Sequence, residues 1–198
     1  MTSPPRLSSG VFYHIYDRGV NRENVFVEVR NCSYFLDLYG KHVAPVVDTY
    51  AYCLLKNHFH LLVRTKDEML PAEASATSLT ASAAFSNFLN AYVKAFNTTY
   101  GRTGSLFQHP FGRVAVHSQT HLLQLVRYIH INPQKHGLID DFRVWPYSSY
   151  PAYVSTRATR LRRDEVLSWF DGVQGFVVAH QVDDRDERAI GSLAPDDL

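Results

Sequence analysis

The segment TYAYCLLKNHFHLLVRT (49–65) constrains the fold of this chain more than any other stretch. Two apolar runs, rich in residues that favour strands, flank the polar pair Lys56-Asn57. This pattern is typical of two antiparallel strands joined by a tight connection. The segment therefore predicts a β-hairpin, and with it a sheet that is at least partly antiparallel.

The second strand of this hairpin carries two histidines separated by one apolar residue. Because side chains two apart in a strand lie on the same face, His58 and His60 are expected side by side, while Phe59 enters the core. Two imidazoles do not complete a closed structural zinc site, but they suit an open site that leaves positions for substrate oxygens. The other interpretation is a pair of polar residues on the wet face of a sheet.

The rest of the chain predicts strands alternating with helices. The expected elements are a strand at 11–19, a helix at 29–44, a loop at 71–79, a helix at 80–101, a strand at 105–118, a helix at 119–137 that stops at Asn132 before Pro133, and a short helix at 157–172. The order β-α-β-β-α-β-α favours an α+β fold, with helices packed on an antiparallel sheet.

The charge of the chain is unevenly distributed, although its net value is only +1. Residues 1–163 hold 18 Lys and Arg against 10 Asp and Glu, whereas residues 164–198 hold 2 against 9. A basic body suits a phosphate-rich partner, and the acidic end is expected to be a mobile tail. The two cysteines form no metal-binding motif, and no apolar run is long enough to span a membrane, so a cytoplasmic protein is expected.

The helix expected at 119–137 has a polar stripe and an apolar stripe. His121, Gln124, Tyr128 and Asn132 fall on the polar side. Tyr128 and Asn132 are one turn apart, so a hydroxyl group and an amide oxygen can point to the same place. The alternative for Tyr128 is a ring packed at the boundary between helix and sheet.

Several segments together resemble the HUH single-tyrosine transposases, especially the REP-associated tyrosine transposases. These segments are YHIYDRGVNRENVF, YAYCLLKNHFHLLV, LFQHPF, RYIHINPQKHGL and WPYSSY, which lie within residues 11–154. The resemblance implies a ferredoxin-like core with residues 1–154 as the transposase domain, followed by a C-terminal helix and tail at 155–198. One departure is His109-Pro110, where relatives more often carry a glycine and a basic residue.

The resemblance also implies roles for particular residues. Tyr128 would be the nucleophile that forms a 5′-phosphotyrosine with single-stranded DNA, and His58, His60 and Asn132 would hold Mg²⁺ or Mn²⁺ without any nucleotide cofactor. The substrate implied is a DNA hairpin, and both a monomer and a homodimer remain open. From their place beside this site in the sequence, side chains expected near the DNA are Arg18, Lys56, Asn57, Gln108, Arg113 and Arg127, and the turn after the first strand, Phe107 and Gln108 are expected to hold or stack unpaired bases.

Other functions remain open at this point. A catalytically silent DNA-binding protein could keep the same fold and recognise a structured repeat. A replication initiator or relaxase would use the same chemistry, but the chain has no helicase-like domain. A general metal hydrolase would give no role to Tyr128 and no covalent adduct with DNA.

Overall fold

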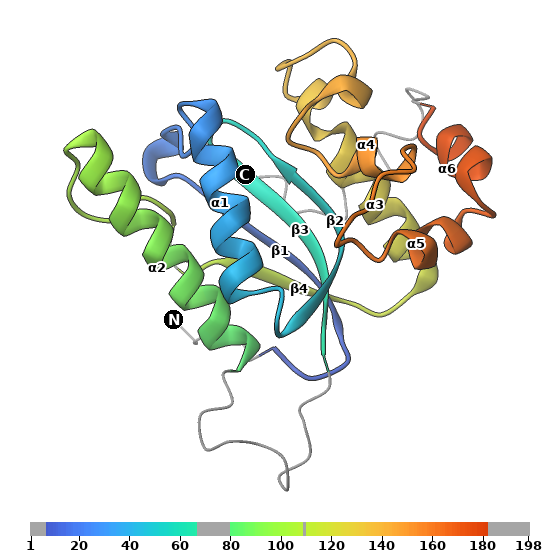
Figure 1. The fold of residues 1–198 in the computed structure, drawn as a ribbon, viewed down its shortest axis with the longest axis horizontal. Helices are drawn as coiled ribbons and strands as arrows, with labels where there is room; N and C mark the ends of the chain where they lie inside the picture. The colour runs from blue at the N-terminus through green and yellow to red at the C-terminus, as the bar shows by residue number, and fades with distance from the viewer. Residues whose placement is uncertain (1–6, 67–79, 109, 182–198) are drawn as a thin grey trace, which may run out of the picture.

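The computed structural model describes residues 7–66, 80–108 and 110–181. The expected loop at 71–79, His109 and most of the acidic end therefore lie outside the described residues. Figure 1 shows a β-sheet with helices on both sides. The elements, in chain order, are β1 (Phe12–Arg18), α1 (Val29–His42), β2 (Val47–Leu54), β3 (His58–Thr65), α2 (Ala81–Tyr100), β4 (Gly112–Val116), α3 (Gln119–Lys135), α4 (Tyr150–Tyr153), α5 (Arg163–Trp169) and α6 (Val173–Ala179).

The four strands form one sheet in the order β2-β3-β1-β4, and every neighbouring pair is antiparallel. The two central strands, β1 and β3, are separated in the chain by α1 and β2. This strand order and the order of elements confirm the α+β, ferredoxin-like fold expected from the sequence. The hairpin of β2 and β3 is also confirmed, with an irregularity in its register between Thr49 and Ala51.

Each face of the sheet buries its own apolar core. Helices α1 and α2 cover one face, where the rings of Phe35, Phe59, Phe88 and Tyr92 lie in contact. Helix α3 and the short helices α4 to α6 cover the other face, and Figure 1 shows the two groups of helices on opposite flanks. The alternation along β3 explains this division, since odd-numbered residues enter the first core and Leu62 enters the second.

Local signals in the sequence define the ends of the two long helices α2 and α3. The Thr80 hydroxyl accepts a hydrogen bond from the Ala83 amide at the start of α2, and Gly101 ends that helix with φ 61°. Ser118 caps α3 in the same way, through the amide of His121. Within the described residues, no helix combines the length and the apolar character needed to cross a bilayer.

Some boundaries differ from those predicted. Helix α3 does not stop at Asn132 but continues through Pro133 to Lys135, because the buried residues around the proline hold this last turn against the core. Strand β4 begins only at Gly112, and the helix expected at 157–172 is shorter, spanning Arg163–Trp169. Helix α6, which packs Phe176 into the second core, was not predicted from the sequence.

Candidate functional site

Strand β3 places His58 and His60 on the face of the sheet beneath α3. Both side chains are buried, with 1% and 0% of their surface exposed, so they do not lie on a wet face. The Nδ1 atom of His58 lies 2.7 Å from the Oδ1 atom of Asn57. Since an amide oxygen only accepts, Nδ1 carries the proton and Nε2 keeps its lone pair. That Nε2 atom has no hydrogen-bond partner among the described residues.

His60 has a similar arrangement, with a second histidine as its partner. Its Nδ1 atom lies 3.0 Å from the Nε2 atom of His14 on β1, and the two rings are stacked with centroids 5.1 Å apart. When His60 donates through Nδ1, its Nε2 atom carries the lone pair. This atom is also buried without a hydrogen-bond partner in the part of the chain that the structure describes.

Helix α3 brings Tyr128 and Asn132 over these histidines. The Tyr128 ring lies 5.4 Å from that of His60, and one turn beyond Asn132 the His136 ring lies 4.9 Å from that of His58. Asn132 lies between these two contacts in the helix. Its Nδ2 atom donates to the Tyr128 carbonyl at 2.7 Å, which leaves Oδ1 buried and, within the described ranges, without a donor.

The three orphaned atoms form a donor set that fits a divalent cation. Two imidazole nitrogens and one amide oxygen are ordinary ligands, and a three-ligand site leaves positions for substrate. No group of three or more His, Cys, Asp or Glu side chains within the described residues is arranged to hold a metal. The two histidines would therefore need a ligand of another type, and the unpartnered Oδ1 atom of Asn132 is of a suitable type. An unpaired buried acceptor costs free energy, which a bound cation would recover.

The electrostatics keep these imidazoles neutral. Burial, followed by the nearby His136 and Arg18, lowers the pKa of His58 to about 3. Burial, followed by the neighbouring His14, also lowers the pKa of His60 well below its usual range. A neutral imidazole is the form that binds a metal. The Lys135 ammonium lies 5.4 Å from the centroid of the Tyr128 ring and brings positive charge to the site.

The residues expected near DNA lie in different places. Arg18 is opposite His58 in the register of β1 and β3. Its side chain is buried, and its Nε atom has no hydrogen-bond partner in the described structure. Asn57 contacts His58, as described above, and the backbone amide of exposed Gln108 donates to the Arg18 carbonyl at 2.7 Å. Lys56 is exposed at the hairpin connection. The structure thus gathers four of the six around the ends of β1 and β3.

The other two lie away from Tyr128. Arg113 pairs with Ile15, whose side chain is in the first core, and its guanidinium lies 4.0 Å from the centre of the Phe111 ring. Arg127 is close enough to His180 to lower its pKa, which puts it on the α6 side of α3. Phe107 is not a base-stacking residue, because it is buried in the first core against Phe59.

Sequence reasoning missed three residues at the site: His14, Lys135 and His136. The first lies two residues before Tyr16 in a strand whose alternation, once the face is known, directs it toward His60. His136 follows Asn132 by four residues, so the helical stripe used to select Tyr128 and Asn132 would have reached it. The expectation that the helix stops at Asn132 removed it from consideration.

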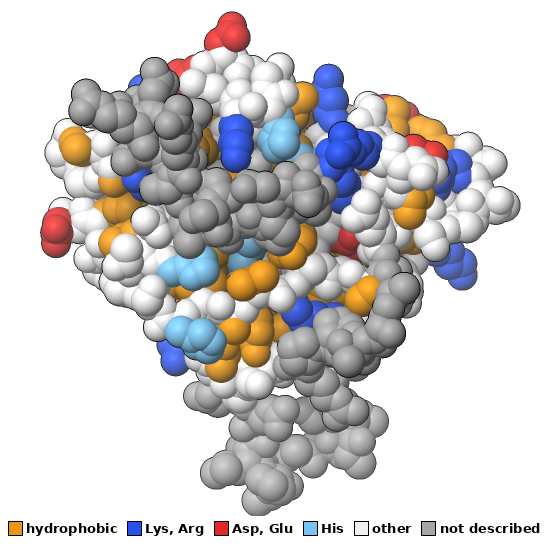
Figure 2. All heavy atoms as spheres, turned by 180° about the vertical axis from the view of Figure 1, so that it is seen from behind, with side chains coloured by type: hydrophobic (Ala, Val, Ile, Leu, Met, Phe, Trp, Pro, Cys, Tyr) orange, Lys and Arg blue, Asp and Glu red, His pale blue; other side chains and the backbone are white. Residues whose placement is uncertain are grey.

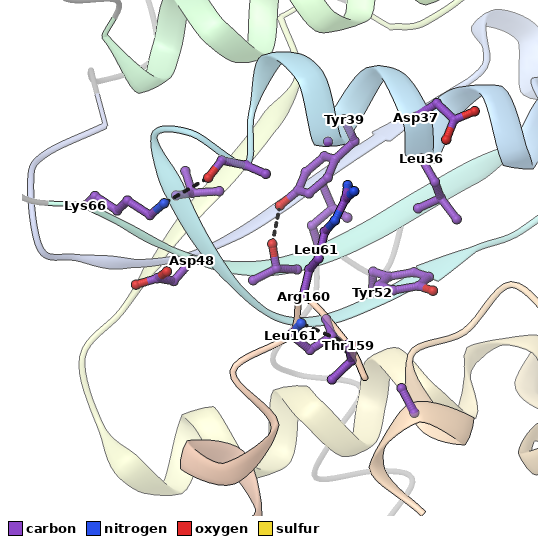
Figure 3. Close-up of a pocket in the computed structure, with 15 residues that line it drawn as sticks. Leu36, Asp37, Tyr39, Asp48, Tyr52, Leu61, Lys66, Thr159, Arg160 and Leu161 are labelled. Carbon is purple, nitrogen blue, oxygen red and sulfur yellow. Dashed lines mark hydrogen bonds between the residues drawn. The ribbon is translucent and has the colours of Figure 1, made fainter. Parts of the chain in front are cut away.

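A separate cavity of about 700 Å³ lies on the α1 side of the sheet. Figure 3 shows Tyr39, Tyr52 and Leu61 on its walls, with Arg160 from the segment before α5. At the start of α5, the Arg163 guanidinium donates to the carbonyls of Ala152, Ser155 and Arg157, and the Arg162 amide donates to the Thr49 carbonyl on β2. The segment thus covers the edge of the sheet, and the cavity does not open at Tyr128.

Comparison with known proteins supports the resemblance seen in the sequence. The chain is 28% identical over 105 residues to a REP-associated tyrosine transposase of Haemophilus influenzae, a match that covers 52% of this chain and 58% of that protein. It has the fold of a solved REP-associated tyrosine transposase bound to a REP hairpin, with a TM-score of 0.57, 18% identity, and coverage of 79% of this chain and 87% of the other. No family model matches the chain.

Proposed function

We propose that this protein is a metal-dependent transposase that cleaves and rejoins single-stranded DNA through a covalent bond to Tyr128. The observation that carries the proposal is the set of three buried acceptors on His58, His60 and Asn132 that have no hydrogen-bond partner among the described residues, with the Tyr128 ring against His60. A purely structural role would have to leave all three unsatisfied at one place. The chain resembles REP-associated tyrosine transposases in sequence and in fold.

The chemistry is a transfer of a phosphoryl group to the tyrosine. The Tyr128 oxygen attacks phosphorus, an O–P bond forms, and the bond from phosphorus to the 3′-oxygen breaks. The phenol proton passes to solvent, and the released 3′-oxygen gains a proton. The product is a 5′-phosphotyrosine, which a second 3′-hydroxyl can attack to rejoin the strand without a nucleotide cofactor.

Residues of this chain prepare that step. Asn57 and His14 orient the two histidines through their Nδ1 atoms, and the Asn132 amide is held by the carbonyl of Tyr128 itself. The Lys135 charge, close to the Tyr128 ring, favours negative charge as it develops at the tyrosine and the phosphate. A bound Mg²⁺ or Mn²⁺ would supply Lewis-acid polarisation of the scissile phosphate.

The proposed partner is a single-stranded DNA hairpin. The solved relative is bound to a REP hairpin, and the body of this chain has the excess of Lys and Arg that phosphate binding requires. Figure 2 shows imidazoles among hydrophobic side chains on the face opposite that of Figure 1, with Lys and Arg side chains nearby.

The test is the formation of a covalent protein–DNA adduct. The full chain is incubated with Mn²⁺ and labelled single-stranded hairpin DNA from beside its gene, then denatured and separated by size. We expect an adduct that is lost in Tyr128→Phe, in His58→Ala and with a chelator. The control is Tyr34→Phe, because Tyr34 is 43% exposed and lies on α1. An adduct that persists in Tyr128→Phe would overturn the assignment, and tight binding with no adduct would favour a silent DNA-binding protein.

A further inference from the structure

The ring of Tyr16 lies flat against strand β4 at Gly112. These residues are partners in the antiparallel pairing of β1 with β4. A Cβ atom on residue 112 would lie 2.2 Å from Cε2 and 2.3 Å from Cζ of the Tyr16 ring, closer than real contacts allow. Gly112 has no positive φ, so its backbone conformation does not require glycine. The glycine is needed because the ring occupies the space of a side chain.

This ring borders the candidate site. Side chains at positions 14, 16 and 18 of β1 share one face, and His60 is the partner of Tyr16 on the other side of the strand. The centroid of the Tyr16 ring is 4.9 Å from that of His14 and 6.3 Å from that of His60. Both imidazoles are buried, whereas Tyr16 keeps part of its surface exposed. Tyr16 is therefore where the buried site meets the solvent along β1.

Helix α3 leaves this part of the sheet more open than the rest. Its main contacts with the sheet are to β2 and β3, so β1 and β4 receive less cover from it. At the far end of β1, Phe12 is covered by Trp169 and Tyr50, but within the described residues Tyr16 makes ring contacts only with His14 and His60. Part of the Tyr16 ring is thus exposed beside the two imidazoles, and no further ring among the described residues packs against it.

A second, independent feature lies next to the ring. Arg18, two residues along the same face, is 7% exposed, and its Nε atom is buried with no hydrogen-bond partner in the described chain. A guanidinium group in this situation lacks the acceptor that would offset its burial. A phosphate oxygen is a strong acceptor for arginine. An aromatic ring followed by a guanidinium whose Nε atom has no partner among the described residues matches the two parts of a nucleotide, the base and the phosphate.

We propose that Tyr16 is a stacking platform for one unpaired nucleobase next to the scissile phosphate, with Arg18 binding a phosphate of the same strand. The inference rests on the proposed function and names a contact by which the substrate is held. A flat aromatic face stacks on any base, so the contact contributes affinity and position with little choice of sequence. Gly112 serves this site by letting the ring lie flat.

The test measures DNA binding in the absence of cleavage. All proteins carry Tyr128→Phe, and fluorescence anisotropy gives the affinity for the single-stranded hairpin oligonucleotide. In a series of oligonucleotides, one base at a time is removed around the cleavage site while its sugar and phosphate remain. We expect one abasic position to weaken binding on the order of 10-fold when Tyr16 is present. In Tyr16→Leu the intact DNA should bind about 10-fold more weakly, with no further loss at that position.

Two more variants separate stacking from a role in folding. Tyr16→Phe keeps the ring and should bind like the parent, and Gly112→Ala keeps the tyrosine but displaces its ring, so it should behave like Tyr16→Leu. Thermal unfolding confirms that each variant is folded, and Tyr34→Leu controls for the loss of an exposed ring elsewhere. Abasic and Tyr16→Leu effects that simply add would overturn the platform. If the Tyr128→Phe protein bound no hairpin DNA at all, the proposed function would fail, and the platform with it.

Discussion

Helix α3 has a buried histidine cluster on each of two sides, and the two clusters are satisfied to different degrees. On the sheet side, His14, His58 and His60 leave several ring nitrogens without hydrogen-bond partners among the described residues. On the side of α4 and α6, His130 and His180 make a hydrogen bond at every ring nitrogen. Both clusters are buried and neutral, so burial alone does not distinguish a site from a structural element.

The hydrogen bonds of the second cluster have only one possible direction. The Ser149 hydroxyl accepts from the Tyr52 amide and donates to Nε2 of His130 at 2.7 Å, because the proton of neutral His130 is on Nδ1. The Phe176 carbonyl accepts from Nδ1 of His180, so Nε2 of His180 accepts from Nδ1 of His130 at 2.9 Å. No lone pair or proton remains for a ligand. Unpaired buried atoms, rather than histidines as such, therefore indicate the functional side of the helix.

The largest expected difference between the two clusters is in their contribution to stability. We expect His130→Leu to reduce the free energy of unfolding by about 4 kcal/mol, because Ser149 and His180 each lose a buried partner. His58→Leu, a matched change in the first cluster, should change the stability of the metal-free protein by about 1 kcal/mol or less, since it removes an unpaired acceptor. Urea unfolding followed by circular dichroism measures both. Equal losses in the two variants would contradict the distinction.

The sequence predicted the fold better than it predicted the contacts within the site. The alternation along 58–65 and the helical pattern of 80–101 are local, so they gave the hairpin, helix α2 and the shared face of His58 and His60. The contact of His14 with His60 depends on the register between β1 and β3, which are separated by α1 and β2. Nothing local determines that register, and no pattern in the sequence indicated the pair His130 and His180, 50 residues apart.

Burial was the second quantity that the sequence did not determine. Phe107 and Tyr16 are both aromatic residues near the ends of strands, and only Phe107 was expected to contact bases. In the fold, Phe107 faces α2 and is buried in the first core, whereas Tyr16 faces the site and is partly exposed. Which aromatic side chain stays accessible depends on how helices cover the sheet, which is a property of the tertiary structure.

The next largest expected effect is a loss of stability as the pH falls. Burial lowers the pKa of His180 to about 4. The hydrogen bond to the Phe176 carbonyl acts in the opposite direction, and the charge of Arg127 lowers the pKa further. His130 on α3 also faces the His180 ring. As the pH falls, His180 therefore takes up a proton near pH 6.5 in the unfolded chain but only near pH 4 in the folded chain. The stability from this group is present above pH 6.5 and falls with the pH to about 4, by about 3 kcal/mol in all.

The measurement is urea unfolding at a series of pH values between 7.5 and 4.5. The comparison variant is His180→Gln, whose amide can accept from His130 and donate to Phe176 but does not titrate. The wild type should lose stability more steeply than the variant as the pH falls through this window. Parallel curves for the two proteins would show that His180 is not held neutral by its surroundings.

The smallest effect concerns His14, which lies between the two kinds of behaviour because it bonds to another histidine and still has an unpaired nitrogen. If His14 orients His60 for a metal, removing the His14 ring nitrogen that accepts from His60 should weaken metal binding without removing a metal ligand. We expect His14→Leu to reduce Mn²⁺ affinity about 10-fold to 100-fold, the usual cost of losing a group that orients a metal-bound histidine. His14→Gln, which keeps an acceptor near the same place, should recover most of the affinity. Calorimetric titration of the DNA-free protein measures this directly, and if both variants bound Mn²⁺ like the wild type, His14 would belong with the structural histidines of the second cluster.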